Sequence, residues 1–458
     1  MKIFGTLLIV FCVYFTYAQN INIQIHYNKR FDEFSMTTHN GSYDIISGNN
    51  LIYRVEKGET VDFSVRWNRI KISYNNKSTL TNKTVTFRGV QQSCYFTLSH
   101  PQEVFPEREY DNDLYISLRN NVFSLINDVN FEKYIAGVVE AEGGAKEHVE
   151  YYKAQSILCR TYAAKHYTKH LDEGFNLCDG QHCQAYKGRC KYNLSILDAA
   201  LQTAGLVVVD SQRNLISATF YANSGGLTAN SEDVWISALP YLRAVEDTFS
   251  LGGRGAVWEK SIPVDRWKDY LHTKGFSVEP CEEFVPYDCD TVWAADSLLY
   301  ADSVDSTQYD YDTLRSDSLS DSLQVQDSST NHVLYRIDTV WNHKQQKHYP
   351  LDFTFKQPVR KKYFSFRGCD TLVTLRSIRS DWRLRSTFFS VSQVEDSVIL
   401  HGKGYGHGVG LSQEGAMRMA QLGYSYDEII TYYFTDVQIM NIRAVNFYRV
   451  DYELEEEE

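Results

Sequence analysis

The chain has 458 residues, of which 43% are hydrophobic and 23% are charged, and its formal net charge is −12 at pH 7. This length predicts two or three domains, and the composition excludes a fibrous or wholly disordered protein. The negative charge is concentrated: thirteen acids and one arginine lie between Glu279 and Asp327, and six acids lie between Asp451 and Glu458. The remaining body is mildly basic, which favours an anionic substrate, and we expect no nucleic-acid partner.

Residues 1–18 have the pattern of a secretory signal peptide. Lys2 supplies the positive charge, residues 3–15 are apolar, and Ala18 closes a short cleavage-site pattern. Cys12 leaves a lipoprotein as the alternative, although the bulky Phe11 precedes it where lipoprotein processing favours a small residue. No later stretch is long and apolar enough to span a bilayer. We therefore expect an exported protein of the periplasm or cell envelope without a transmembrane segment.

Strand patterns fill the first part of the chain. Apolar and polar residues alternate over residues 20–100, and turn signals separate the alternating runs. A second pair of strands is expected at 114–118 and 122–126, with a hairpin turn between them. We interpret residues 19–105 as a small β-rich N-terminal domain.

A long segment from Phe131 to His170 follows these strands. Residues 134–139 form an apolar, strand-like run that ends beside Glu140 and Glu142. The spacing of Val149, Cys159 and related residues then predicts an amphipathic helix over 146–169. Further on, a helix is expected at 195–201, strands at 206–209 and 216–221, and a helix at 414–422. Helices and strands thus intersperse, which indicates an α+β fold.

Residues 279–332 are rich in Asp and Ser and read as a solvated insertion. A calcium site there is the alternative, but loop-type acid spacing and glycines are missing. Cys281 and Cys289 could close one disulfide loop. After the insertion, glycines alternate between His401 and Gln413, which indicates a loop that approaches a ligand or another backbone closely. A phosphate-binding loop is disfavoured because no Gly-Lys-Ser/Thr sequence follows.

Several collinear segments resemble the SpoIID/LytB family of bacterial cell-wall proteins. They cover roughly residues 110–250 and 350–440, and they are YIAGVVEAE from Tyr134, KAQSILCRTYA from Lys153, CQAY from Cys183, SGGLT from Ser224, LRSTF from Leu384, GYGHGVGLSQ from Gly404 and the stretch 420–433. The resemblance implies a mixed, β-rich SpoIID-like catalytic domain in two parts, 106–278 and 333–445, followed by an acidic tail at 446–458.

The resemblance also implies an activity. Members of this family act on peptidoglycan, and SpoIID members are lytic transglycosylases that cut the MurNAc-GlcNAc bond of peptide-free glycan and leave a 1,6-anhydro-MurNAc end. One carboxylate can serve this reaction first as the acid and then as the base. Glu142 matches the catalytic glutamate, whereas Glu140 falls at a variable position and is expected to be a solvated charge. Gly143 and Gly144 depart from the usual Met-Pro, which predicts a loose helix start.

Further residues are carried over as substrate-binding by their match to the family segments: Arg160, Tyr162, Ser224, Gly225, Gly226, His407, Ser412 and Gln413. A buried ion pair is the alternative role of Arg160. A structural hydrogen-bonding role is the alternative for His407. A Ser224/His407 nucleophile pair lacks a third member and is disfavoured.

His170, Cys178, His182 and Cys183 have zinc-ligand spacing, and some SpoIID members carry a structural zinc on comparable residues. A disulfide between Cys178 and Cys183, or one that involves Cys190, is the alternative. No organic cofactor and no catalytic metal are expected. LytB-type relatives enhance cell-wall amidases without catalysis, so a glycan-binding amidase enhancer is the second hypothesis for function.

Overall fold

The computed structural model describes residues 20–91, 93–144, 146–276, 353–365 and 371–445. The expected signal peptide, the whole acidic insertion with Cys281 and Cys289, and the acidic tail lie outside these residues. The described chain combines several sheets with helices, so the α+β prediction is confirmed. None of its helices is both long and apolar enough to cross a bilayer.

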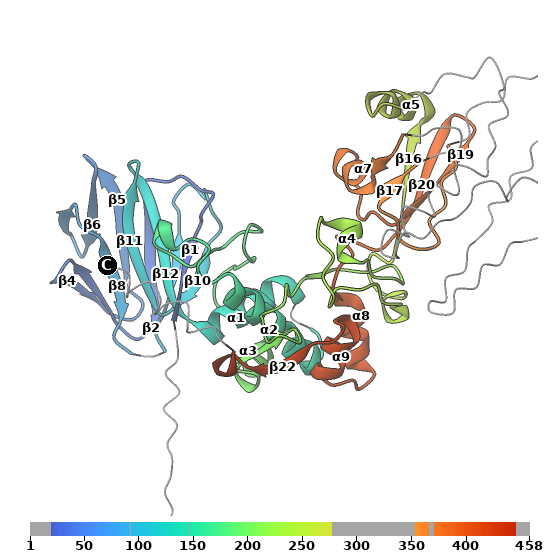
Figure 1. The fold of residues 1–458 in the computed structure, drawn as a ribbon. Helices are drawn as coiled ribbons and strands as arrows, with labels where there is room; N and C mark the ends of the chain where they lie inside the picture. Colours follow the sequence, from blue (N-terminus) through green and yellow to red (C-terminus); the bar gives the residue numbers. More distant parts are fainter. Residues whose placement is uncertain (1–19, 92, 145, 277–352, 366–370, 446–458) are drawn as a thin grey trace, which may run out of the picture.

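Two sheets at the N-terminal end pack face to face (Figure 1), and all their strand pairs are antiparallel except β1 with β13. The first has the order β13-β1-β12-β11-β8-β3-β4, and the second has the order β10-β9-β2-β5-β6-β7. The strands of the first sheet are β1 (Asn20–Ile25), β3 (Tyr43–Ser47), β4 (Asn50–Val55), β8 (Val85–Gly89), β11 (Asp113–Arg119), β12 (Val122–Asn130) and β13 (Leu177–Cys178). Those of the second are β2 (Glu33–Asn40), β5 (Thr60–Arg66), β6 (Arg69–Tyr74), β7 (Lys77–Thr81), β9 (Tyr95–Ser99) and β10 (Arg108–Asp111).

Alternating residues of both sheets fill the space between them. Phe34 of β2 meets Phe123 of β12 edge to face, with ring centroids 4.8 Å apart, and Tyr43 of β3 meets Phe96 of β9 in the same way. The sandwich continues past residue 105, because β11 and β12 pair with β8 and β1. The two sheets thus take in β11 and β12, which end at Asn130, and also the later strand β13.

Helices occupy the centre of the molecule (Figure 1). They are α1 (Phe131–Gly143), α2 (Val149–Lys165), α3 (Leu194–Gln202), α4 (Ser231–Val234), α8 (Gln413–Gln421) and α9 (Tyr426–Tyr433), together with the strand pair β14 (Leu206–Val209) and β22 (Gln438–Asn441). The predictions of α3, β14 and α8 were close in position. The predicted amphipathic face of α2 was wrong, because this helix is buried on almost every side.

A smaller lobe forms around a third sheet with the order β16-β20-β19. Its elements are β16 (Val257–Pro263), α5 (Val264–Thr273), β17 (Tyr363–Phe364), β18 (Val373–Thr374), α7 (Leu375–Asp381), β19 (Phe389–Val394) and β20 (Ser397–Lys403). Trp267 is completely buried in a hydrophobic core that is separate from the core shared by the sandwich and the central helices. Of the strand expected at 216–221, only β15 (Phe220–Tyr221) forms, and it pairs in parallel with β21 (Leu411–Ser412).

Candidate active site

Helix α1 carries Glu142 in its last turn. The side chain of Asn130 starts the helix by accepting hydrogen bonds from the backbone N–H groups of Glu132 and Lys133. The strand-like interpretation of residues 134–139 was wrong, because this apolar run is a helical segment packed on all sides. A helix surrounded by protein needs no polar face, so its sequence lacks the 3.6-residue alternation of a surface helix.

The Gly143-Gly144 pair ends α1. A Cβ on Gly143 would lie 2.9 Å from the hydroxyl of Tyr151, and Gly144 has φ 76° and ψ 174°, a conformation that residues with a side chain avoid. The expected loose start of the next helix is therefore wrong. Instead, the two glycines fix the point at which the chain leaves α1, and His148 caps the start of α2.

Glu142 is exposed at the surface, yet surrounding protein removes enough hydration to raise the pKa of its carboxyl. A hydrogen bond from the backbone N–H of Ala185 and the charge of Lys187 act in the opposite direction. The position at the C-terminal end of α1 also disfavours a negative charge, because the helix dipole is negative there. The geometry thus favours a carboxyl that holds its proton to higher pH than an ordinary glutamate.

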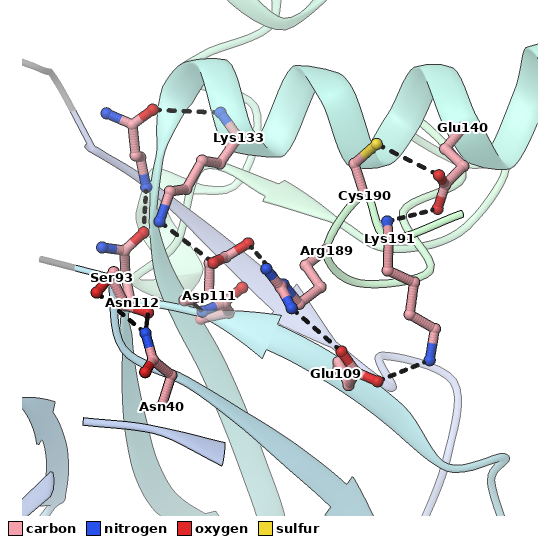
Figure 2. Close-up of polar contacts among 12 residues, drawn as sticks. Asn40, Ser93, Glu109, Asp111, Asn112, Lys133, Glu140, Arg189, Cys190 and Lys191 are labelled. Atoms are coloured by element: carbon pink, nitrogen blue, oxygen red, sulfur yellow. Dashed lines mark hydrogen bonds and ion pairs between the residues drawn. The ribbon is translucent and has the colours of Figure 1, made fainter. Parts of the chain in front are cut away.

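Glu140 lies on another side of α1, and both oxygens of its carboxylate accept hydrogen bonds from the protein (Figure 2). Its carboxylate accepts hydrogen bonds from the backbone N–H groups of Lys191, Tyr192 and Asn193 at 2.8 to 3.1 Å, and from the thiol of Cys190 at 3.3 Å. Residues 190–193 directly precede α3. The expectation of a solvated surface charge was therefore wrong, and Glu140 ties the end of α1 to the start of α3.

The glycine-rich loop reaches the end of α1 from the distant part of the chain. The side-chain amide of Gln413 donates a hydrogen bond of 3.4 Å to the backbone carbonyl of Glu142. The Ser224-Gly225 turn packs against this loop so closely that a Cβ on Gly225 would lie 2.5 Å from the backbone nitrogen of Gly404. These contacts bring together three of the segments in which the sequence resembles the SpoIID/LytB family: those that begin at Tyr134, Ser224 and Gly404.

Ser224 is buried inside this junction. Its hydroxyl donates to the carboxylate of Asp247 at 2.8 Å, and its backbone N–H donates to the hydroxyl of Ser412. Burial raises the pKa of Asp247, which also accepts from Tyr433. Ser224 and Ser412 are thus buried within the turn, and their hydroxyls hold it together.

His407 uses both ring nitrogens within the protein. Nδ1 accepts from the backbone N–H of Val409 at 3.1 Å, so Nε2 carries the proton and donates to the carbonyl of Phe220 at 3.1 Å. Burial lowers the pKa of His407 to about 4. Within the described part of the chain, no hydrogen bond joins His407 to Ser224, and the structural role of this imidazole is the one that the geometry supports.

Arg160 is completely buried, with 0% of its surface exposed. Its guanidinium pairs with the carboxylate of Glu132 at 2.5 Å and donates to the backbone carbonyls of Ala200 and Leu206. This geometry supports the buried ion pair, which the sequence analysis gave as the other role of Arg160. The pair joins α1, α2 and the start of β14.

Removing this guanidinium will destabilise the protein strongly, because Glu132 would keep a partly buried charge without its partner. We expect Arg160→Ala to lower the free energy of unfolding by about 3–5 kcal/mol in denaturant titrations. The matched control is Arg418→Ala on the exposed side of α8, which should change it by less than about 0.5 kcal/mol. Equal stability of both variants would contradict the structural role.

The four predicted metal ligands come together beside β13. One donor atom from each of His170, Cys178, His182 and Cys183 lies within 4.8 Å of the others. The contacts from sulfur to nitrogen measure 3.5 Å for Cys183 to His170, 3.8 Å for Cys178 to His182 and 3.9 Å for Cys183 to His182. A tetrahedral zinc site requires such separations to be about 3.6 Å. The donor set therefore fits zinc, and both thiols are free rather than joined.

Residues around this cluster complete a typical zinc environment. The carboxylate of Glu173 lies 2.7 Å from Nδ1 of His170, while Nε2 of the same ring faces the cluster. A carboxylate in this place fixes the orientation of a ligating imidazole. Tyr162 stands nearby, half-buried, and loss of hydration raises the pKa of its phenol to about 12.

Comparison with known proteins shows which family the sequence of this region matches. Residues 119–209, which contain α1, α2 and the His/Cys cluster, match the family described as "SpoIID: Stage II sporulation protein". Stage II sporulation protein D of Bacillus subtilis is 24% identical over 334 residues, which cover 70% of this chain and 77% of that protein. Residues 119–209 of the chain thus match the SpoIID family, and the wider chain is similar to Stage II sporulation protein D.

Two further relatives extend the comparison. The amidase enhancer of Bacillus subtilis is 27% identical over 66% of this chain, but the match covers only 39% of that longer protein. An uncharacterised protein of Brachyspira hyodysenteriae is 25% identical over 74% of both chains. The likeness to these SpoIID-related proteins extends beyond the 119–209 match into the rest of the chain.

The sequence analysis missed Glu173, Asp247 and the role of Glu140 in this SpoIID domain. Glu173 lies three residues after His170, a spacing that could have suggested a partner for the imidazole. Asp247 lies 23 residues after Ser224, and no local pattern connects the two. Only the folded turn brings the Asp247 carboxylate and the Ser224 hydroxyl together.

Proposed function

We propose that this protein is a peptidoglycan lytic transglycosylase that cuts the MurNAc-GlcNAc bond of peptide-free glycan strands. Glu142 acts as the general acid and then as the general base. The observation that carries the proposal is the position of Glu142 at the exposed end of α1, with its pKa raised by surrounding protein. A carboxyl that keeps its proton near neutral pH is the group this reaction needs first.

The steps require one carboxyl group. Glu142 donates its proton to the glycosidic oxygen as the bond to C1 of MurNAc breaks. The resulting carboxylate then accepts the proton of the C6 hydroxyl, whose oxygen closes on C1 to give the 1,6-anhydro ring. A hydrolytic glycosidase would need a second free carboxylate about 5–10 Å away. Glu140, two residues from Glu142, is already held by three backbone N–H groups, which favours the single-carboxyl route.

The other residues hold this acid in place. Gln413 anchors the carbonyl of Glu142, and Glu140 anchors the preceding turn to α3. His170, Cys178, His182 and Cys183 would hold a zinc ion and would fill all four of its coordination positions. The bound ion would fix the segment between α2 and α3. We propose a structural role for this metal.

The proposal includes export to the cell envelope, which rests on the signal-like residues 1–18.

The activity is tested by incubating the purified protein with denuded glycan strands. The proposal predicts shorter strands over time, as measured by size-exclusion chromatography, and unchanged strand length in buffer alone. Strands that keep their length with an intact, folded protein would contradict it.

A second candidate function is a non-catalytic, glycan-binding enhancer of a cell-wall amidase. The similarity to a protein named amidase enhancer favours it. An enhancer would increase the release of peptides from intact peptidoglycan by an added amidase, and Glu142→Gln would leave that increase unchanged. An enzyme, by contrast, loses its effect on denuded glycan in this variant.

The pH dependence of cleavage gives an independent prediction. The protonated form of Glu142 is the active acid, so kcat/KM should fall as pH rises through its pKa, which lies above the ordinary value of 4.5. The charge of Lys187 lowers that pKa, so Lys187→Gln should move the falling limb to higher pH. A limb that stays in place or moves to lower pH would show that another group titrates.

A further inference from the structure

The turn between β5 and β6 carries an exposed tryptophan. Trp67 is 84% exposed, and the side chains of Arg66 and Arg69 on both sides of it are exposed as well. The two central residues, Trp67 and Asn68, have φ of 50° and 56°. Positive values at both positions define the tight hairpin turn that matches the twist of the strands.

This turn is an unusual place for tryptophan. The same sandwich closes two other hairpins with positive φ at both central positions, and there it uses Asn75-Asn76 and Asn120-Asn121. Asparagine tolerates the left-handed conformation, whereas a bulky side chain is strained in it. Because Trp67 is exposed and strained, it adds nothing visible to the stability of the fold. A residue that breaks a local rule without a structural gain points to a function.

Other loops gather at the same end of the sandwich. The backbone N–H of Val65 donates to the carbonyl of Asp32, that of Phe123 donates to Phe31, and the hydroxyls of Ser47 and Thr81 lie 2.7 Å apart. These contacts hold the connections β1–β2, β3–β4, β5–β6, β7–β8 and β11–β12 side by side. Strand β12 leads away from this end to α1, and α1, which carries Glu142, lies beyond the opposite end (Figure 1).

Positive charge flanks the tip of this hairpin, because Arg66 and Arg69 lie on either side of Trp67. Six cations lie on or beside the gathered loops: Lys29, Arg30, Arg66, Arg69, Lys83 and Arg119. The acids there are Asp32 and Glu33, Glu103 and Glu107 in the β9–β10 connection, and Glu173 beside Arg119. Arg119 pairs with Glu173, whereas the other five cations form no ion pair with any described residue. Trp67 thus stands at the tip of a hairpin with unpaired positive charges around it.

We propose that this end of the sandwich docks on an anionic lipid surface, with Trp67 inserted at the headgroup level. The tip of a hairpin projects outward and suits a flat partner, whereas a glycan strand is usually bound in a concave groove. Indole rings favour the interface between water and lipid, and arginine and lysine side chains are attracted to anionic headgroups. Docking in this way turns α1 and Glu142 away from the membrane.

The test uses the chain from Gln19 onward, so that the apolar residues 3–15 do not contribute. The protein should co-sediment with vesicles that contain phosphatidylglycerol, bind phosphatidylcholine vesicles at least 10-fold more weakly, and lose affinity as salt rises. Trp67→Asn should weaken binding to the anionic vesicles at least 10-fold. The same substitution should raise the thermal midpoint of unfolding, because asparagine suits the turn.

The matched control is Ile236→Ala, at a side chain that is 96% exposed outside the sandwich, and it should bind vesicles as the unchanged protein does. The proposal is overturned if the protein does not sediment with anionic vesicles, or if Trp67→Asn binds them equally well. It is also overturned if Trp67 is needed for sedimentation with purified glycan but not with vesicles. Vesicle binding is measured without glycan, so its failure is distinct from a failure of the proposed enzymatic activity.

Discussion

Glu142→Gln will abolish cleavage of denuded glycan and leave the fold unchanged. Glutamine has the shape of glutamate, and the exposed side chain makes no contact that the amide would disrupt strongly. However, the amide cannot donate a proton to the leaving oxygen. Loss of a general acid typically lowers the rate by about 10²–10⁴-fold. The rate of strand shortening, together with circular dichroism of the variant, measures both parts of the prediction.

Glu140→Gln is the matched control for this experiment. The neutral amide keeps one acceptor oxygen but weakens the charge-assisted hydrogen bonds from the backbone of residues 191–193. We expect a loss of about 1–3 kcal/mol in unfolding free energy and measurable residual activity. If Glu140→Gln were inactive and Glu142→Gln active, Glu140 rather than Glu142 would be the catalytic acid.

Removal of the metal ligands will lower the stability of the protein strongly. The purified protein should contain one zinc ion per chain, and Cys183→Ser should lose it. At a free zinc concentration about 1,000-fold above the dissociation constant, binding stabilises the folded state by about 4 kcal/mol. Cys183→Ser and treatment with a chelator should therefore lower the thermal midpoint in parallel, as measured by calorimetry.

Cys94 provides the control for the zinc prediction. Its thiol is buried in the sandwich, far in the sequence from the cluster. Cys94→Ala should keep one zinc ion per chain and lose stability only through local packing. A protein without zinc, in which mass spectrometry finds Cys178 and Cys183 joined, would instead establish the disulfide alternative.

The sequence predicted the elements whose pattern is local. The alternating strands of the sandwich, the short helix α3 and the strand β14 follow from periodicity and turn residues. Helix α1 was mistaken for a strand because residues 134–139 are apolar without interruption, and neighbouring elements cover that segment from all sides. For the same reason α2 shows no single apolar face. Complete burial removes the alternation on which sequence interpretation depends.

The candidate site was predicted where it depends on nearby residues. The four ligands lie within 14 residues, and their spacing together with the family resemblance suggested zinc, with a disulfide as the alternative; the geometry of the donor atoms fits zinc. The roles of Arg160, Ser224 and His407 depend on partners far along the chain, such as Glu132 and Phe220. In the fold these side chains contact the framework of the protein, and for Arg160 and His407 this is the alternative that the sequence analysis had left open.

The most direct test of the central claim is the chemical nature of the glycan ends that the protein produces. Denuded strands incubated with the protein and analysed by mass spectrometry should carry 1,6-anhydro-MurNAc ends, and strands incubated with Glu142→Gln should carry none. Reducing MurNAc ends formed by addition of water would contradict the transglycosylase mechanism. Intact strands after incubation with a folded, zinc-loaded protein would contradict enzymatic function altogether.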